Sequence, residues 1–455
     1  MLEVLHDRTF RHLFAAQALA LIGTGLATVG LGLLAFEIAG ANAGAVLGTA
    51  SAIKMIAYVG IAPLASAFAD RLPRRVMLIG LDLVRAAVAS VLPFVDHVWQ
   101  IYVLIFALQS ASAAFTPAFQ ATIPDILADE RQYTRALSLA RLAYDLENLL
   151  SPALAAALLT VMGFHWLFAG TTLGFVASAM LVGSVTLPRA APVETSGGIV
   201  ARTTWGARIY LRTPRLQGLL AINFAAAAAG SMVIVNTVVL VRGVLGRSPN
   251  DVAFALAAFG SGSMAVALAL PRVLDRVPER PVMIAGAGMA AVTLLGTAAA
   301  FQRAGIGWVV LTVAWLLMGA SYAAMLTPSG RLLRRSTHPA DRPALFAAQF
   351  ALSHVCWLVT YPLAGWLGAT FGMSSAIAAL GSIALLGSIL AALRWPAVDP
   401  GKLVHSHTDL DPEHPHLRDV GVAHEGQVHE HAYIIDALHS RWPTHADSFD
   451  KASRR

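Results

Sequence analysis

Charged residues are scarce in this sequence. Asp, Glu, Lys and Arg make up only 13% of the 455 residues, whereas 57% are apolar. About a quarter of the residues of an ordinary soluble domain are charged, so most of this chain lacks the side chains needed to face water. The single cysteine, Cys356, excludes an intramolecular disulfide. The sequence also lacks a phosphate-binding loop and any nucleophile–base pattern, so we expect neither an enzyme nor direct use of ATP.

Long apolar runs take the place of the missing charge. An α-helix needs about 20 apolar residues to cross the hydrocarbon of a bilayer. Stretches near this length, each bounded by charge, Pro or Gly, fall at 12–38, 43–68, 76–94, 98–122, 138–161, 165–187, 215–240, 251–273, 282–301, 306–328, 344–368 and 372–393. The pattern predicts an all-α membrane protein with twelve transmembrane helices.

Positive charge is divided unequally between the loops that join these stretches. The termini and the loops on their side carry 21 Arg and Lys residues, against three in the opposite loops. Because cytoplasmic loops carry the excess of Arg and Lys, both termini are predicted to be cytoplasmic. We expect a multi-pass protein of the bacterial inner membrane. Its partners are the lipid bilayer and its substrates, with no nucleic acid and no obligate protein partner.

Two halves of the chain echo each other. The run Asp-Arg-Leu-Pro-Arg-Arg at 70–75 recurs as Asp-Arg-Val-Pro-Glu-Arg at 275–280, and Ser151-Pro152 recurs as Tyr361-Pro362. Six helices thus repeat as six, and repeated halves of this kind bind substrate near the bilayer midplane between them. We divide the chain into an N-terminal six-helix bundle (1–187), a cytoplasmic linker (188–214), a C-terminal six-helix bundle (215–394) and a histidine-rich cytoplasmic tail (395–455).

The repeated loop resembles the signature loop of the major facilitator superfamily, with Pro73 where that family usually has Gly. The run 151–156 resembles the family's antiporter motif, with small residues in place of Gly. The resemblance implies the major facilitator fold, two pseudo-symmetric six-helix bundles, and favours export over import. The charged loops are predicted to latch the two bundles in one state, which makes gating residues of Asp70, Arg71, Arg74, Arg75, Asp275, Arg276 and Arg280.

Ionisable residues inside a span point to function by default, because each costs ~2.5–3.5 kcal/mol to insert. Asp82 and Arg85 are three residues apart on one helix face, which favours a structural ion pair. Lys54 either extends to the interface or neutralises a carboxylate in the cavity, and the sequence does not decide between these. Three further residues in span 5, Asp145, Glu147 and Asn148, are predicted to include at least one that faces substrate or exchanges a proton.

The repeat places span 11 opposite span 5, with His354 and Cys356 at depths similar to those of Asp145 and Glu147. Together these residues form a mixed oxygen, nitrogen and sulfur set. Imidazole and thiolate favour Ni, Co, Zn or Cu over Mg or Ca. Taken alone, the histidine and cysteine are also compatible with ordinary helix packing.

The tail has a different composition. Nine of the fifteen histidines lie between 405 and 455, and a histidine-rich tract is typical of metal binding. Six form His-x-His pairs that are predicted to bind metal: His405, His407, His414, His416, His429 and His431. Residues 433–442 show apolar spacing that predicts a short helix docked on the bundle or the membrane.

A major facilitator body with such a tail resembles the nickel-resistance exporters of bacteria. The resemblance implies export of a divalent transition metal such as Ni²⁺ or Co²⁺, driven by proton entry and without a cofactor. Asp145 and Glu147 would bind cation and proton in turn by alternating access. One alternative is export of a small organic molecule, such as a drug or siderophore, with a regulatory metal-binding tail. A second is a metal sensor built on a transporter scaffold.

Overall fold

The computed structural model describes most of the two bundles and parts of the tail. The described residues are 2–69, 73–127, 132, 136, 139, 151, 153–187, 199–338, 341–397, 399, 403–406, 428–431, 433–436, 438–439 and 441–442. Eight of the predicted site residues lie outside this part of the chain: Asp70, Arg71, Asp145, Glu147, Asn148, His407, His414 and His416.

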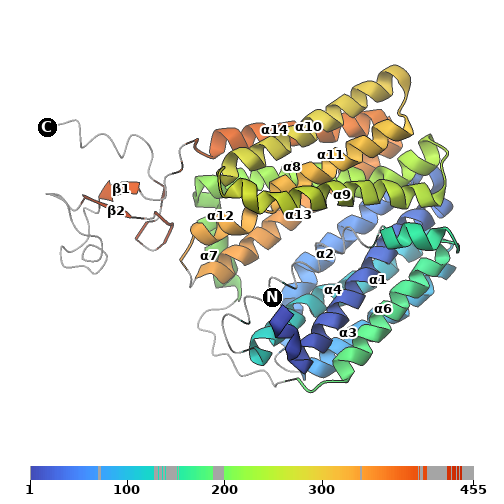
Figure 1. Ribbon diagram of the computed structural model, residues 1–455, viewed down its shortest axis with the longest axis horizontal. Helices are drawn as coiled ribbons and strands as arrows, with labels where there is room; N and C mark the ends of the chain where they lie inside the picture. The colour runs from blue at the N-terminus through green and yellow to red at the C-terminus, as the bar shows by residue number, and fades with distance from the viewer. Residues whose placement is uncertain are drawn as a thin grey trace.

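The first half of the chain forms one helical bundle (Figure 1). Its elements are η1 (Leu2–His6), α1 (Arg8–Ala39), η2 (Gly40–Asn42), α2 (Ala43–Ala69), α3 (Arg74–Val91), η3 (Leu92–Phe94), α4 (Val98–Ile126) and α6 (His165–Gly183). Helix α7 (Ile199–Arg212) follows and packs against the second bundle, where the Trp205 indole donates a hydrogen bond to Asp341 (3.0 Å).

The second bundle begins directly after α7. Its elements are α8 (Pro214–Val238), the π-helical turn η4 (Val239–Val244), α9 (Pro249–Leu274), α10 (Glu279–Ala304), α11 (Trp308–Leu326), α12 (Ser329–Arg335), α13 (Arg342–Phe371) and α14 (Met373–Arg394). Two tail strands, β1 (Leu403–Ser406) and β2 (Val428–His431), then pair in an antiparallel ladder that aligns His405 with His429.

The all-helical membrane fold predicted from the sequence is confirmed. Ten stretches in the described ranges are long and apolar enough to cross a membrane, and one of them, Arg8–Ile61, contains both α1 and α2. Eleven spanning helices are therefore described, and the predicted span at 138–161 lies mostly outside the described residues. In α-helices every backbone group bonds within its own segment, which lipid requires.

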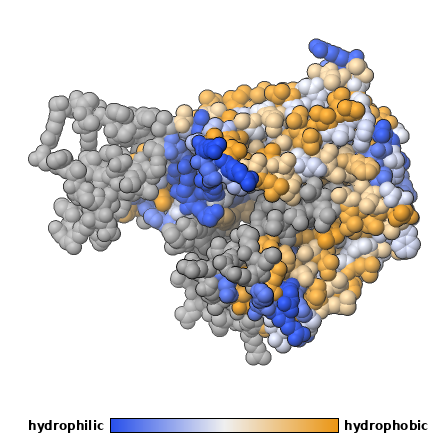
Figure 2. Space-filling view, viewed as in Figure 1, coloured by the Kyte–Doolittle hydropathy of each residue, from blue (hydrophilic) through white to orange (hydrophobic). Residues whose placement is uncertain are grey.

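The helices present apolar side chains to their surroundings. Hydrophobic residues cover the flanks of both bundles, while hydrophilic residues gather mainly toward the helix ends (Figure 2). Phe94 is 81% exposed and Trp166 is 65% exposed. Such large exposed apolar surfaces are unfavourable in water and favourable in lipid, so these flanks are the membrane-facing surface.

The two bundles share a core at only one end. We call the end that carries the N-terminus, α7 and α12 the terminal end, and the other the distal end (Figure 1). One apolar core runs through the second bundle and into the distal half of the first, including Leu33, Val46 and Leu92. A separate core, which includes Phe10, Leu78 and Phe119, fills the terminal end of the first bundle alone. Among the described residues, the bundles are therefore joined at the distal end.

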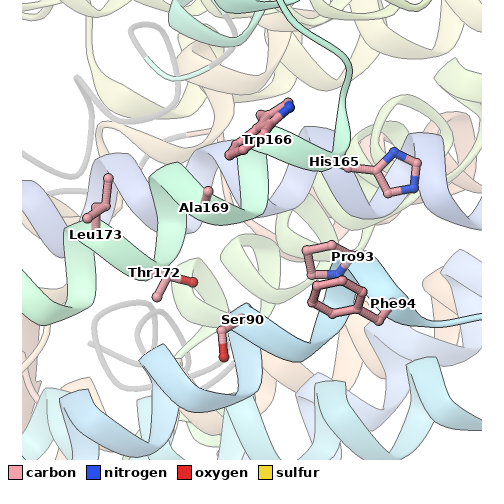
Figure 3. A pocket seen from close by; sticks show the side chains of 8 residues that line it. All are labelled: Ser90, Pro93, Phe94, His165, Trp166, Ala169, Thr172 and Leu173. Atoms are coloured by element: carbon pink, nitrogen blue, oxygen red, sulfur yellow. The ribbon is translucent and has the colours of Figure 1, made fainter.

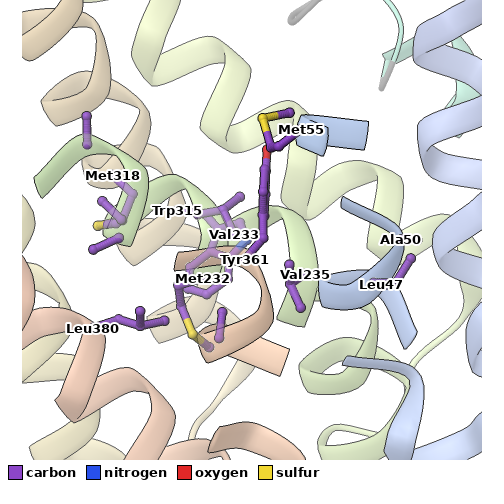
Figure 4. Packing of buried hydrophobic residues seen from close by; sticks show 14 of the residues in the cluster. Leu47, Ala50, Met55, Met232, Val233, Val235, Trp315, Met318, Tyr361 and Leu380 are labelled. Atoms are coloured by element: carbon purple, nitrogen blue, oxygen red, sulfur yellow. The ribbon is translucent and has the colours of Figure 1, made fainter. Parts of the chain in front are cut away.

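Helices α2 and α13 make the tightest contact between the bundles. A methyl group added at Gly365 would collide with the backbone oxygen of Gly44, so α13 needs glycine at this position. A methyl group added at Gly48 would likewise collide with the carbonyl oxygen of Tyr361. Farther along the two helices, Met55 of α2 and Tyr361 of α13 belong to the same apolar core (Figure 4). The small residues bring the two backbones together and close the distal end.

The tail departs from the sequence prediction in one respect. The described residues between 433 and 442 contain bends and no helix, so the predicted short helix is wrong for this part. The Asp436 carboxylate accepts hydrogen bonds from the backbone N–H groups of Leu438 (2.8 Å) and His439 (2.7 Å). Such local bonds compete with helix formation. The apolar residues are buried instead by docking on the second bundle, as Tyr433 and Ile435 belong to its core.

Candidate functional site

A cluster of rings lies between the bundles, midway along α2 and α13. The Tyr58 ring on α2 stacks on the His354 imidazole of α13, with centroids 5.8 Å apart and 14° between the planes. The Phe350 ring lies 3.9 Å from the same imidazole. The Lys54 ammonium lies 5.9 Å from the centre of the Tyr58 ring. We call Lys54, Tyr58, Phe350 and His354 the central cluster.

Helical spacing assembles this cluster. Lys54 and Tyr58 are four residues apart on α2, as are Phe350 and His354 on α13, so each pair lies on one helix face. The His354 Nδ1 lies 2.6 Å from the Phe350 carbonyl oxygen. A carbonyl can only accept, so Nδ1 carries the proton and Nε2 of the neutral ring is left with its lone pair. The imidazole can therefore accept a hydrogen bond or a proton on Nε2.

The cluster suits an organic ligand. Aromatic faces bind flat rings by stacking, and the negative face of a ring also attracts cations. The rings of the cluster come from opposite bundles, so a ligand that stacks on them would contact both bundles at once. Sequence reasoning found Lys54 and His354 but missed Tyr58 and Phe350. The available signal was an aromatic residue one helical turn from each ionisable residue.

The structure directs His354 and Cys356 to different partners. The Cys356 thiol is 6% exposed and donates to the Leu352 carbonyl (3.4 Å). It also interacts electrostatically with the phenol of Tyr210 on α7, which adds to burial in raising the pKa of Tyr210. Two residues along a helix correspond to a rotation of about 200°, which explains the separation. Within the described ranges, no three His, Cys, Asp or Glu side chains are grouped so that they could hold a metal ion.

Asp82 and Arg85 form the structural ion pair that their spacing predicts. The Arg85 guanidinium bonds to the Asp82 carboxylate, and both side chains are buried. Ser178 on α6 donates a second hydrogen bond to Asp82 (2.7 Å). The rings of Phe115 and Phe175 lie 4.1 and 4.6 Å from the guanidinium carbon. The pair thus joins α3, α4 and α6 inside the first bundle.

Two of the described gating candidates, Arg75 and Arg280, make hydrogen bonds within single bundles. Arg75 on α3 donates to the Gly183 carbonyl at the end of α6. Arg280 donates to the carbonyls of Trp395 and Ala392, both at 2.9 Å, at the end of α14. The Asp275 and Arg276 side chains are exposed, and Arg74 is half-buried. Asp70 and Arg71 lie outside the described residues, so the latch between bundles stays a prediction.

Glu279, which the sequence analysis left out, is the acidic residue that organises the repeated loop. It is 8% exposed and lies 3.2 Å from Arg331 and 3.9 Å from Arg335. These contacts tie the start of α10 to α12. Its position inside the run at 275–280 was the available signal, but α12, the helix that faces it, is distant in the sequence.

The six tail histidines are described in part. The backbone register aligns His405 with His429 and Leu403 with His431. His407, His414 and His416 lie outside the described residues. The strands thus bring together two of the three His-x-His segments, although the third segment lies between them in the sequence.

An apolar groove of about 700 Å³ lies elsewhere, at the distal end of the first bundle (Figure 3). It is lined by Ser90, Pro93, Phe94, His165, Trp166, Ala169, Thr172 and Leu173. These residues come from the end of α3, from η3 and from the start of α6, on the membrane-facing flank. Its exposed apolar walls face lipid rather than the space between the bundles.

Two bundles of spanning helices that meet across a central cluster define a multi-pass membrane transporter. The sequence profile of the Major Facilitator Superfamily matches residues 13–243 and 219–418, so the chain belongs to that family. The fold agrees with solved structures. A bacterial homologue of the human lysosomal transporter Spinster has a TM-score of 0.67 at 13% identity and covers 86% of this chain and 98% of its own. The nucleoside transporter NupG has a TM-score of 0.63 at 13% identity, over 85% and 98%.

The curated relatives are exporters or unassigned transporters. Macrolide efflux protein A of Streptococcus pyogenes is 29% identical over 185 residues, which cover 40% of this chain and 45% of that protein. Macrolide efflux protein A of Enterococcus faecalis is 30% identical over 144 residues, 30% of this chain and 44% of that protein. An uncharacterised MFS-type transporter of Bacillus subtilis is 24% identical over 62% of this chain and 68% of its own length. The match spans less than half of the macrolide efflux proteins.

Proposed function

We propose that this protein exports a small organic molecule across the bacterial inner membrane, by alternating access and in exchange for protons. The observation that carries the proposal is the central cluster, in which Tyr58 from one bundle stacks on His354 from the other. Relatives that are macrolide efflux proteins support an organic substrate. With the termini on the cytoplasmic side, as the loop charges predict, the joined distal end is the outer one.

The mechanism follows from the placement of the cluster. A ligand that stacks on the rings of Tyr58 and Phe350 would contact both bundles at the depth where α2 and α13 face each other. A ligand that contacts two bodies changes the relative stability of their arrangements, as alternating access requires. His354 would take up a proton on Nε2 when the ligand leaves, and so couple export to proton entry.

Transport into everted vesicles tests the proposal. We expect vesicles with an acidic interior to accumulate a radiolabelled macrolide, and the double variant Tyr58→Ala/Phe350→Ala to lose at least ~10-fold of the initial rate, because each stacked ring contributes about 1 kcal/mol. The matched control is Phe94→Ala, which removes a ring from the membrane-facing groove. Equal rates for the cluster variant and the control would show that the central cluster is not the substrate site.

Nickel or cobalt export, and the resemblance to nickel-resistance exporters, remain the rival proposal. It rests on Asp145, Glu147, His354 and Cys356. Uptake of radioactive nickel, added outside the same vesicles, decides between the two. Proton-dependent nickel uptake that is abolished by Asp145→Asn/Glu147→Gln, with no macrolide uptake, would replace the organic substrate with a metal.

The tail is proposed to bind a divalent transition metal and to regulate rather than carry the flux. The strand register that aligns His405 with His429 supports this role. We expect the intact protein to bind Ni²⁺ in titration calorimetry, and replacement of all six paired histidines by Ala to remove at least one site. His97 and His165, which lie at the distal end, provide the control replacements. Metal binding without flux of any substrate would instead favour the sensor.

A further inference from the structure

Arg215 joins four separate parts of the chain at the terminal end. It lies in the first turn of α8 and is 5% exposed. Its Nε donates to the Ser336 hydroxyl just after α12 (2.9 Å), and its Nη1 donates to Asp399 (3.0 Å). Its Nη2 donates to the carbonyl of Tyr433 (3.4 Å), and its flat face lies 5.0 Å from the Trp442 ring centre. Because a buried guanidinium needs partners for all its donors, these parts are held together.

The tail segment 433–442, which we call the docked segment, also contributes apolar burial. Ile435 is 1% exposed and Tyr433 is 8% exposed, whereas Leu438 is 39% exposed. The Tyr433 and Trp442 rings meet edge to face, with centroids 5.2 Å apart. Burial and the nearby Asp436 carboxylate raise the pKa of Tyr433 to about 12, so its phenol keeps the proton that it donates to the Arg441 carbonyl (2.8 Å).

A second contact reaches the connection between α12 and α13, which we call the corner. Asp436 accepts a hydrogen bond from His439 Nδ1 (2.9 Å) and lies 3.4 Å from Nε2 of His338. His338 follows α12 by three residues. The docked segment is thus linked to the corner twice. The first link is indirect, through Arg215 of α8, which bonds to both Tyr433 and Ser336. The second is the direct contact between Asp436 and His338.

The corner is also tied from its other side. Arg335 at the end of α12 bonds to Asp399, and Arg331 bonds to Glu279 at the start of α10 (3.2 Å). Helix α13 begins only a few residues later, at Arg342. The same helix carries Phe350 and His354 of the central cluster and the Gly365 contact. A restraint on the corner therefore acts on the helix that joins the two bundles.

We propose that the docked segment is a releasable latch that holds the corner between α12 and α13 and so restrains α13. When the segment leaves, Arg215 loses the Tyr433 carbonyl and the Trp442 ring, and the core loses Ile435. The corner then keeps its bonds to Arg215, Asp399 and Glu279 but has lost those to the docked segment. Because β2 ends at His431, two residues before Tyr433, a ligand of the tail is positioned to control release. The latch is independent of what the protein transports.

Two measurements on the full-length protein test the latch without any substrate. Hydrogen exchange of 433–442 reports docking. Alkylation of Cys356, the only cysteine and a buried residue of α13, reports movement of that helix. We expect Ile435→Ala to speed both rates ~10-fold or more, since removing a buried aliphatic side chain changes a local equilibrium by at least that factor. Leu438→Ala, the matched control with an exposed side chain, should leave both rates unchanged.

The possible outcomes separate clearly. Fast exchange of 433–442 with an unchanged Cys356 rate would overturn the latch, because undocking would then leave α13 unaffected. Unchanged exchange in Ile435→Ala would overturn the docking itself. If Ile435→Ala does not fold, Trp442→Ala removes the ring from Arg215 without opening the core, and the same two rates apply. Failure of macrolide transport has no effect on either measurement.

Discussion

The Tyr58 ring of the first bundle stacks on the His354 imidazole of the second, with 5.8 Å between the ring centres. The two residues belong to different halves of the sequence, so the contact exists only in an arrangement that brings α2 and α13 together. This stacked pair lies at the centre of the proposed transport path.

The first prediction concerns the chemistry of that stack. Tyr58→Phe keeps the ring and should transport a labelled macrolide within about twofold of the natural rate, whereas Tyr58→Ala should fall about fivefold, because one stacked ring contributes about 1 kcal/mol. The measurement is the initial rate of uptake into everted vesicles. If Tyr58→Phe is as slow as Tyr58→Ala, the phenol hydroxyl rather than the stacking face carries the role.

A second prediction concerns the distal contact. Gly365→Ala adds a methyl group against the backbone of Gly44, so the bundles can no longer close there and transport should be lost. Gly296→Ala on α10 is the control, because nothing lies within 4 Å of the added methyl group. Its melting temperature should be unchanged or slightly raised, since Ala is favoured over Gly in a helix by up to about 1 kcal/mol. Normal transport by Gly365→Ala would show that transport does not depend on this close approach of α13 to α2.

The third prediction separates structure from function at Asp82. Asp82→Asn removes the carboxylate charge that pairs with the buried Arg85, which should cost about 3–5 kcal/mol of stability and lower the thermal unfolding temperature in detergent. The ion pair of Asp96 with His97 provides the comparison. The side chains of His97 and Asp96 are 64% and 71% exposed, so Asp96→Asn should not shift the melting curve measurably. A normal melting curve for Asp82→Asn combined with lost transport would assign the pair to the transport cycle.

The fourth prediction concerns the pH dependence of docking. Burial acts to raise the pKa of Asp436, but hydrogen bonds from His439 and the backbone outweigh it and hold that pKa well below the ordinary value of 3.8. A group whose pKa is lowered in the folded state stabilises that state above its ordinary pKa, and the contribution is lost as the pH falls below it. Among the described residues, the groups near the carboxylate are His439, His338, the Tyr433 phenol and the N–H groups of Leu438 and His439.

We therefore expect Asp436→Asn to increase exchange of 433–442 at pH 7, after correction for the intrinsic chemical rate. The difference from the natural protein should narrow as the pH falls below 3.8 toward the point where the carboxyl group is protonated. An equal difference at pH 7 and at acid pH would show that shape, rather than charge, explains the effect of the substitution.

Local pattern was sufficient for several features. The length of each apolar run fixes a spanning helix, because the bilayer thickness and the rise of an α-helix are constant. The ion pair between Asp82 and Arg85 was predictable because both lie on one helix, three residues apart. The repeated loop identified two matched halves, and the family match over residues 13–243 and 219–418 agrees with that interpretation.

Other features were decided by tertiary contacts. The apolar spacing of 433–442 predicted a helix, but the partners that bury Tyr433 and Ile435 belong to a distant bundle. His354 and Cys356 are a second case. Their similar depth predicted one ligand set, but the rotation of the helix between the two positions directs their side chains to different partners. Sequence alone determined the lipid-spanning architecture, since each helix satisfies its own backbone. Only the packed structure decided which side chains meet between α2 and α13 and where the tail docks, because those contacts join residues that no local periodicity connects.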